Sequence, residues 1–438
     1  MPLKSRHITI SPKDFIHGPY VTCPKCGENT FGVLMICARH YCRRCSSCFW
    51  PKGSESGGSY PLPELRKNII YLDQCAISDM MKAINPKTKA HQNGRVAPFW
   101  RQLFEKLDSL SKLQLIICPD SDFHKHESLL SPFYKALHNM YEHLSHGISF
   151  YDHKTIHRFQ IMRQLRIWLK DKKDKELNVD DIVHGELHSW QERFRITVGN
   201  SSWPALIDEL RTNRDKVEDY LLPIFQRWQR ETDKDFDYWF QQEIKSNAGV
   251  LVELYEKQLK EFAMVAYGLK PLVLGAVMPN MATITFQGIN DVLEKHDIPK
   301  DQLNSQLGEF LRSETFEETP YMRISSMLYA AMARKAASGR KKPPSKGFKN
   351  DVDIVSTLLP YCDVMFVDNE IRAFLSERPL CEKLKYKTQI FSFSNKEKFL
   401  ECLDGIKDAA SKRHLDKVKE VYGEDWGKPY VEMYGKRG

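Results

Sequence analysis

The segment from Asn350 to Asn369, which reads NDVDIVSTLLPYCDVMFVDN, constrains the fold of this 438-residue chain most strongly. Its first half has apolar residues at helical spacing with Asp351 in the first turn, and Pro360 marks a turn after it. The apolar run from Val364 to Val367 is typical of a buried strand that delivers Asp368 at its carboxyl end. Because sites in open α/β sheets are built at that end of the strands, the segment predicts a strand and a helix framed by carboxylates.

A second apolar, β-rich run extends from Asn68 to Leu72 and ends at Asp73. A helix is expected next, with Ser78 and Asp79 as candidate caps. A carboxylate at the end of a buried strand must be paired, hydrogen-bonded or bound to a metal, because an isolated buried charge is costly. Two interpretations of Asp73 therefore stand side by side, a site residue and a helix cap.

A third strand is predicted from Leu115 to Cys118, followed by the sequence PDSDFHKHESLL. Asp120, Ser121 and Asp122 can cap a helix that carries Glu127, which points toward Asp73 if the two strands are neighbours. His124 and His126 are two residues apart and so diverge on a helix, which predicts surface histidines rather than a metal pair.

Cysteine spacing defines an N-terminal module. Of eleven cysteines, six lie between Cys23 and Cys48, and they include two Cys-x-x-Cys knuckles, Cys23 with Cys26 and Cys45 with Cys48. Four thiolates suit a closed tetrahedral zinc site whose metal stabilises a segment too small to fold alone. Cys37, His40 and Cys42 are alternative ligands, and the arrangement resembles a zinc ribbon. The nearby arginines offer phosphate contacts, although a structural role for the zinc is favoured: Arg39, Arg43 and Arg44.

Composition sets broad limits on the class of protein. The chain is 42% hydrophobic, enough for a sizeable core, and no long apolar run predicts a membrane span. The N-terminus does not resemble a secretory signal, and cysteines clustered as metal ligands suit a reducing compartment, so a cytoplasmic protein is expected. A net charge of +8 permits nucleic-acid binding without requiring it.

The order of these features predicts six regions: a zinc-ribbon module at 1–55, a Gly/Ser/Pro-rich linker at 56–65, an α/β part at 66–145, a mainly helical insertion at 146–320, a second α/β part at 321–400, and a C-terminal helix with a basic tail at 401–438. The tryptophans of the insertion are predicted to be core residues rather than base-stacking platforms: Trp168, Trp190, Trp203, Trp228 and Trp239.

A basic loop, SGRKKPPSKGFK, precedes Asp351. It follows an amphipathic helix that starts near Tyr321, and its Arg340, Lys341 and Lys342 are candidate contacts for substrate phosphate. After Asp368 the sequence predicts another helix and a strand from Gln389 to Ser392.

Together, YLD at Asp73, the helix-borne Glu127 and the segment DVDIVSTLLPYCDVMFVDN resemble PIN-domain nucleases, or more loosely PIN-like domains. The resemblance covers about 66–145 and 320–400 and implies a Rossmann-like parallel sheet, interrupted here by the helical insertion. It also implies RNA cleavage with Mg²⁺ or Mn²⁺ held by clustered acids. By position these acids are Asp73, Glu127, Asp351 and Asp368, with Asp353 as the rival of Asp351.

Elementary chemistry agrees with what the resemblance implies, because hard divalent ions prefer oxygen ligands and crowded carboxylates need a cation to stay ionised together. The leading hypothesis is a metal-dependent endoribonuclease that acts as a toxin or defence effector, with RNA favoured over DNA and a zinc ribbon that helps to hold RNA or a protein partner. The alternative is a catalytically inactive PIN-like module that binds RNA or acts as an assembly scaffold. No membrane is expected as a partner.

Overall fold

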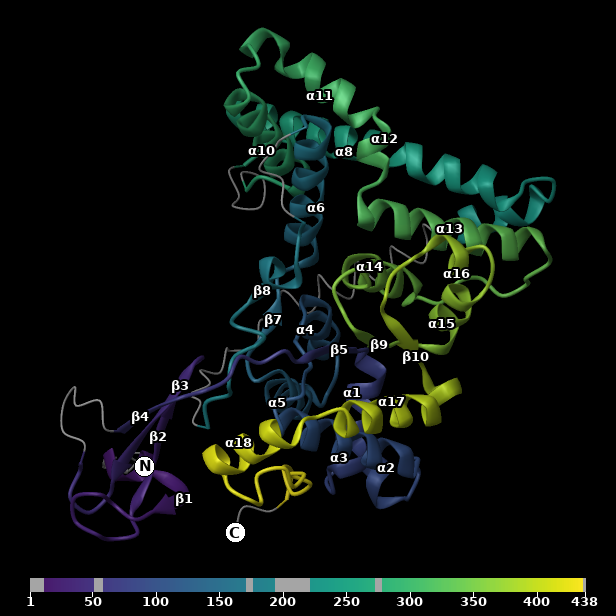
Figure 1. Ribbon diagram of the computed structural model, residues 1–438. Coiled ribbons are helices and arrows are strands. Elements are labelled where there is room, and N and C mark those ends of the chain that lie inside the picture. The colour runs from purple at the N-terminus through teal and green to yellow at the C-terminus, as the bar shows by residue number, and fades with distance from the viewer. Residues whose placement is uncertain (1–11, 51–57, 171–175, 194–220, 272–277, 436–438) are drawn as a thin grey trace, which may run out of the picture.

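A parallel β-sheet lies at the centre of the computed structural model, which describes residues 12–50, 58–170, 176–193, 221–271 and 278–435 (Figure 1). Its strand order is β10-β9-β5-β6, and every neighbouring pair is parallel. All four strands fall in the predicted runs, namely β5 (Asn68–Leu72), β6 (Ile116–Ile117), β9 (Val364–Phe366) and β10 (Gln389–Phe391). Strands from both ends of the chain therefore pair directly, with β5 and β9 side by side at the centre.

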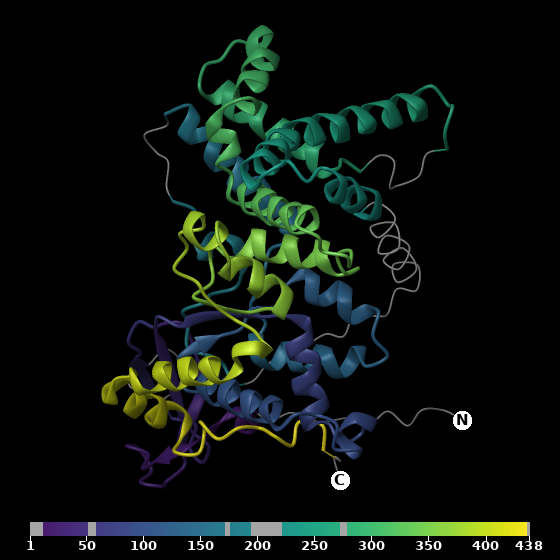
Figure 2. The same ribbon diagram turned by 90° about the vertical axis from the view of Figure 1, so that its right-hand side faces the viewer.

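Both faces of this sheet are buried. Ile69 and Tyr71 of β5 enter one core, whereas Ile70 and Leu72 enter the other, as the two-residue period of a strand requires. Figures 1 and 2 show helices on both sides of the sheet, which is the usual arrangement for parallel strands. The first core, which Ile69 and Tyr71 enter, includes side chains of α4 (Asp122–Leu129), α13 (Pro320–Ala337), α14 (Phe348–Leu358) and α15 (Asn369–Ser376). The second core includes side chains of α1 (Gln74–Ile84), α3 (Pro98–Lys112), α5 (Tyr134–Ser145) and α17 (Lys396–Asp408).

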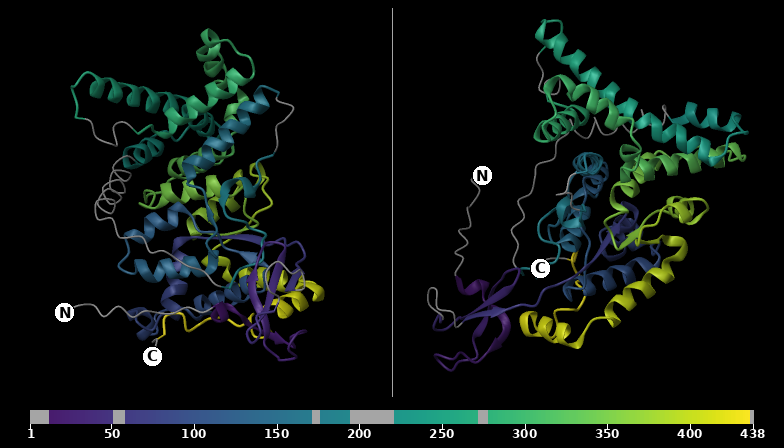
Figure 3. Two further views of the ribbon diagram at one scale, coloured as in Figure 1. Left: turned by 90° about the vertical axis from the view of Figure 1, so that its left-hand side faces the viewer. Right: turned by 45° about the horizontal axis from the view of Figure 1, so that its top comes forward.

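The middle of the chain is mainly helical and shares the first core with the sheet. Its elements are β7 (Ser149–Phe150), α6 (His153–Trp168), β8 (Val183–His184), α8 (Phe236–Ala266), α10 (Met281–Lys295), α11 (Leu303–Leu311) and α12 (Glu314–Glu317). Figure 3 shows that most of these helices project beyond the sheet on one side. Trp190, Trp228 and Trp239 are buried as predicted and Trp168 is half-buried, while Trp203 lies outside the described residues.

The cysteine-rich segment forms a separate antiparallel sheet in the order β1-β2-β3-β4. Its strands are β1 (His17–Val21), β2 (Phe31–Ile36), β3 (His40–Cys45) and β4 (Ser59–Pro61). The last of these lies inside the predicted linker, where its backbone pairs with β3 as an edge strand.

Helix α18 (Lys412–Tyr422) attaches the antiparallel sheet to the rest of the molecule. Tyr41 donates a hydrogen bond to Glu420 Oε1 at 2.6 Å, and Arg43 Nη2 donates to the Glu420 carbonyl at 2.9 Å. Arg43 is buried and also bonds the carbonyls of Pro19 and Phe31. Its guanidinium therefore serves the fold and is not available to phosphate in the way the sequence suggested.

The remaining short helices connect these elements: η1 (Pro12–Phe15), α2 (Lys89–Gln92), η3 (Val179–Ile182), η4 (Lys300–Gln302), α16 (Leu380–Lys383) and η5 (Phe393–Asn395). Among the helices that the structure describes, none combines the length and the apolar character needed to cross a bilayer.

Candidate functional sites

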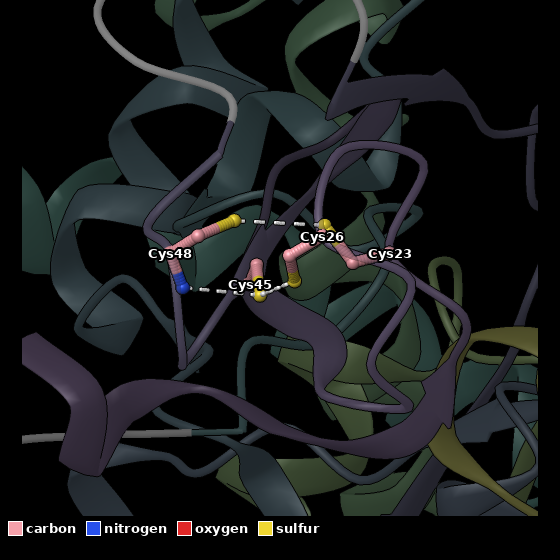
Figure 4. Close-up of side chains that lie close together, drawn as sticks. All are labelled: Cys23, Cys26, Cys45 and Cys48. Atoms are coloured by element: carbon pink, nitrogen blue, oxygen red, sulfur yellow. Dashed lines mark hydrogen bonds between the residues drawn. The ribbon is translucent and has the colours of Figure 1, made fainter.

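The four cysteines predicted as metal ligands converge at one end of the antiparallel sheet (Figure 4). Their sulfur atoms all lie within 4.8 Å of one another, with Cys23 Sγ at 3.7 Å from Cys48 Sγ and Cys26 Sγ at 3.6 Å from Cys45 Sγ. Gly27 has a φ of +75°, which lets the first knuckle turn tightly. This group can hold a metal ion, and the alternative ligands Cys37, His40 and Cys42 lie outside it.

The surroundings of Cys45 favour its thiolate form. Burial raises the pKa of Cys45, but hydrogen bonds from the Cys48 backbone N–H and the Thr30 hydroxyl outweigh burial and lower the pKa to about 6. A thiolate is the form that binds metal, so the loop around the second knuckle prepares a ligand.

Two predicted acids, Asp73 and Asp368, stand at the carboxyl ends of neighbouring strands. Leu72 of β5 pairs with Phe366 of β9, and the Asp73 backbone N–H donates to the Phe366 carbonyl at 2.9 Å. Each acid is also a helix cap: Asp73 accepts from Gln74 N at 2.7 Å and Asp368 from Ile371 N at 2.6 Å. The cap and site interpretations of Asp73 are thus compatible, whereas the predicted start of α1 at Ser78 and Asp79 is wrong because Asp73 itself caps this helix.

Glu127 and Asp351 reach the same region from two helices of the first core. Glu127 lies on α4 and accepts a hydrogen bond from Asn350 Nδ2 at 3.3 Å, and Asp351 is the next residue on α14. The carboxylates of Asp73, Asp368 and Glu127 all act on the ionisation of Asp351. The structure therefore brings near one another the four acids that the family resemblance implied. More than two hundred residues separate Glu127 from Asp351 in the sequence.

Ionisation of Asp351 is opposed by its surroundings. Burial raises the pKa of Asp351 to about 9, and the charges of Asp73, Asp368 and Glu127 add to the effect. Burial and Asp73 likewise raise the pKa of Asp368, against the lowering effect of the Ile371 N–H. A region that resists the ionisation of its own carboxyl groups is one that a cation would stabilise.

The donor atoms of the four acids are less closely grouped than the sulfur atoms of the four cysteines. Among the described residues, only the four cysteines form a set of three or more metal-ligand side chains whose donor atoms all lie within 4.8 Å of one another. The carboxylates of Asp73, Glu127, Asp351 and Asp368 interact through their charges without meeting that separation.

Asp353, the rival of Asp351, has different neighbours. It is buried, accepts a hydrogen bond from Tyr321 Oη at 3.1 Å and forms an ion pair with Lys349. Residues two apart on a helix point in different directions, and here Asp351 alone turns toward Asp73 and Asp368.

His124 contradicts the prediction of a surface histidine, whereas His126 is exposed as predicted. The His124 ring is 2% exposed and stacks between Tyr71 and Tyr141, with Nε2 at 2.7 Å from the Leu72 carbonyl and Nδ1 at 3.1 Å from Asp120 Oδ1. Hydrophobic spacing alone did not show this role, because it depends on partners in two other segments. The His124 ring links the ends of β5 and β6 beneath the acid group.

Arg340 of the basic loop forms an ion pair with Glu370, an acid close to Asp351 and Asp368. Its Nη1 is 2.5 Å from Glu370 Oε1, and the charge of Glu370 in turn acts on Asp351 and Asp368. Lys341 and Lys342 are exposed. Sequence reasoning missed Glu370. Its position two residues after Asp368, in the first turn of a helix, could have indicated it.

A pocket of about 260 Å³ also opens beside Asp368. Aromatic side chains form part of its wall, with Trp100 and Phe393 stacked at 5.5 Å between ring centroids. Phe393 is 38% exposed, and the Lys396 ammonium lies 4.2 Å from the centre of its ring. Cys75 and Asp79 line the same pocket, and the Cys75 thiol donates to Asp73 Oδ2 at 3.1 Å.

Comparisons of this chain with protein-family models, with curated proteins and with solved structures find no match. The fold and the two residue groups are therefore the basis for any functional conclusion.

Proposed function

We propose that this protein is a metal-dependent nuclease of PIN-like fold that hydrolyses phosphodiester bonds in RNA. The observation that carries the proposal is the approach of Asp73, Glu127 and Asp368 to Asp351 at the carboxyl edge of the parallel sheet, where burial and the charges of these acids together raise the pKa of Asp351 to about 9. The four acids come from two strand ends and two helices and would all carry the same charge. A bound cation would offset the repulsion between them.

Mg²⁺ or Mn²⁺ is the ion that this donor set fits. The candidate ligands are all carboxylate oxygens, and hard divalent cations prefer oxygen. A bound divalent ion supplies an activated water and neutralises charge on a transferring phosphate.

The chain's own residues offer positions for the nucleic acid around the acids. Asp73 and Asp368 are fixed at their helix caps, and the Cys75 thiol also bonds the second oxygen of Asp73, so both carboxylates keep a defined direction. Lys341 and Lys342 lie exposed on the loop that also carries Arg340, beside Glu370. These cations are suited to hold the phosphate backbone, while the acids face the bond to be cut.

The test is cleavage of fluorescently labelled single-stranded RNA by the full-length protein with Mn²⁺ or Mg²⁺. Asp73→Asn and Asp368→Asn each keep the shape of the cap residue and remove its charge, so we expect each to lower the cleavage rate at least about 100-fold. Asp416→Asn, which changes an exposed acid on α18, is the matched control and is expected to cleave at the rate of the unchanged protein.

Circular dichroism of each variant shows that loss of cleavage is not loss of folding. Failure of the unchanged protein to cleave RNA or DNA with either metal would contradict the proposal and favour the alternative, a PIN-like module that binds RNA or a protein partner without cutting. Equal cleavage by Asp73→Asn and the unchanged protein would show that the activity lies elsewhere.

We further propose that the four-cysteine group holds one structural zinc ion. Its sulfurs suit a tetrahedral ion, all four tetrahedral positions are supplied by cysteine, and such closed sites are structural. The zinc content of protein purified under reducing conditions is expected to be one equivalent.

A further inference from the structure

Lys67 is buried at the edge of the parallel sheet opposite the acids. It directly precedes β5, whereas Asp73 directly follows that strand. The residue is 3% exposed, and its ammonium has no hydrogen-bond or ion-pair partner among the described residues. Burial alone lowers the pKa of Lys67 to about 7. A buried amine without a partner is costly to the fold, so its retention calls for a reason.

A cavity of about 600 Å³ adjoins Lys67. Its wall combines Ile36 and Ala38 of the cysteine-rich segment, the segment from Ser189 to Arg193 and Trp426 after α18 with residues of the α/β part. The residues of the α/β part that line it, besides Lys67, include Lys112, Ile117, Glu142, His143, His146 and Ile148. Small-molecule sites occupy roughly 300–1,000 Å³ and are common where parts of a protein meet.

The other cations that line the cavity already have partners. Lys112 Nζ is 3.0 Å from Asp108 Oδ2, and His143 Nε2 is 2.7 Å from Asp108 Oδ1. Arg193 Nη2 donates to the Val421 carbonyl at 2.6 Å. Lys67 therefore differs from these three residues, because its side chain has no hydrogen-bond or ion-pair partner among the described residues.

Three other residues of the wall carry buried donor atoms that lack an acceptor among the described residues. These are Gln191 Nε2, Arg193 Nε and Trp426 Nε1. The Gln191 amide oxygen, by contrast, accepts from Gln114 Nε2 at 3.1 Å. Buried polar groups are normally satisfied, and here the unsatisfied ones around a single cavity are all donors.

We propose that this cavity binds a small molecule through an oxyanion, a phosphate or carboxylate group that pairs with the Lys67 ammonium. Three glutamates also line the cavity, namely Glu142, Glu186 and Glu192. Glu192 accepts from the Ile36 backbone N–H at 2.7 Å, and none of the three raises the pKa of Lys67, for which burial is the only cause. The anion must then come from outside the described chain. This site is independent of the proposed nuclease site.

Isothermal titration of the full-length, zinc-loaded protein tests the proposal, with inorganic phosphate, acetate and adenosine monophosphate as separate probes. At least one probe is expected to bind at one equivalent, and Lys67→Met is expected to weaken that binding at least tenfold. Lys398→Met, an exposed lysine on α17, is the matched control and is expected to bind as the unchanged protein does. Tighter binding of phosphate or of acetate shows whether the ligand group is a phosphate or a carboxylate. Tighter binding of the nucleotide than of phosphate shows that the cavity also contacts the rest of the ligand.

Proton uptake provides a second readout that needs no variant. Because the ammonium form binds an anion, binding near pH 7 should take up a proton from the buffer, and affinity should fall as the pH rises above 7. Absence of binding by all three probes, equal binding by Lys67→Met, or an affinity that does not change between pH 6 and 9 would each overturn the proposal. RNA cleavage is not part of either readout, so failure of the nuclease proposal leaves this test intact.

Discussion

At the scale of single residues, the ionisation of Asp351 is the property with the clearest consequence. Its pKa rises from 3.8 in a free side chain to about 9, because of burial and the nearby carboxylates. The folded protein therefore holds a proton that the unfolded chain releases between these values. Folding stability contributed by this group falls as the pH rises from about 4 to about 9.

We expect Asp351→Asn to remove this pH dependence. Without divalent cations, the variant should be more stable than the unchanged protein at pH 9 by at least about 1 kcal/mol, the free energy of roughly one pKa unit. Urea unfolding at pH 5, 7 and 9 measures the difference. Added Mn²⁺ should raise the melting temperature of the unchanged protein more than that of the variant. Parallel pH profiles for the two proteins would show that Asp351 is not coupled to the other acids.

At the scale of elements, the antiparallel sheet depends on few apolar contacts of its own. The core around the cysteines consists of Cys23, Phe31 and Cys45, with Cys48, Trp50 and Tyr60 packed against it. Such a small core supplies little hydrophobic free energy, so we expect metal binding to supply much of the stability. The second contribution is the contact between this sheet and α18.

Removing the metal should unfold β1 to β3 while the parallel sheet remains folded. Hydrogen exchange after treatment with a strong chelator is expected to show loss of protection in residues 17–45 and retained protection in β5 and β9. Cys45→Ser should reproduce this pattern, whereas Cys381→Ser, an exposed cysteine outside the group, should not. Retained protection of residues 17–45 after complete metal removal would argue against a structural ion.

At the scale of the whole molecule, charge is concentrated where the two halves of the chain meet. The basic loop connects α13 to α14 and so stands beside acids that come from both halves. Cations that neutralise RNA phosphates release counterions, which makes binding depend on salt.

We expect the double variant Lys341→Gln/Lys342→Gln to bind single-stranded RNA more weakly and with a smaller salt dependence. Each lost phosphate contact should reduce the slope of log affinity against log salt by about 0.7. Fluorescence anisotropy at several salt concentrations, with Asp368→Asn as the background to prevent cleavage, measures this slope. A double variant with the slope of its parent would show that the loop does not contact the backbone; Lys398→Gln is the control.

Local sequence was sufficient for the elements and for the composition of the sites. Apolar runs ending in an acid located β5 and β9, because strand periodicity and burial are properties of a few consecutive residues. Cysteine spacing selected the four ligands, since two knuckles place their sulfurs on tight turns whatever the surrounding fold. The same patterns could not show that residues 59–61 join a sheet or that His124 is buried, because both depend on distant partners.

The sequence by itself selected the residues that are proposed to carry the chemistry, namely four cysteines and four acids at strand and helix ends. Only the tertiary structure decided which of them lie close to one another. The pairing of β5 with β9 brings Asp73 and Asp368 to one edge, and helix direction turns Asp351 toward them while Asp353 meets Lys349. Nothing in the sequence indicated a site at Lys67, because the cavity beside it is formed by residues from many separate segments of the chain.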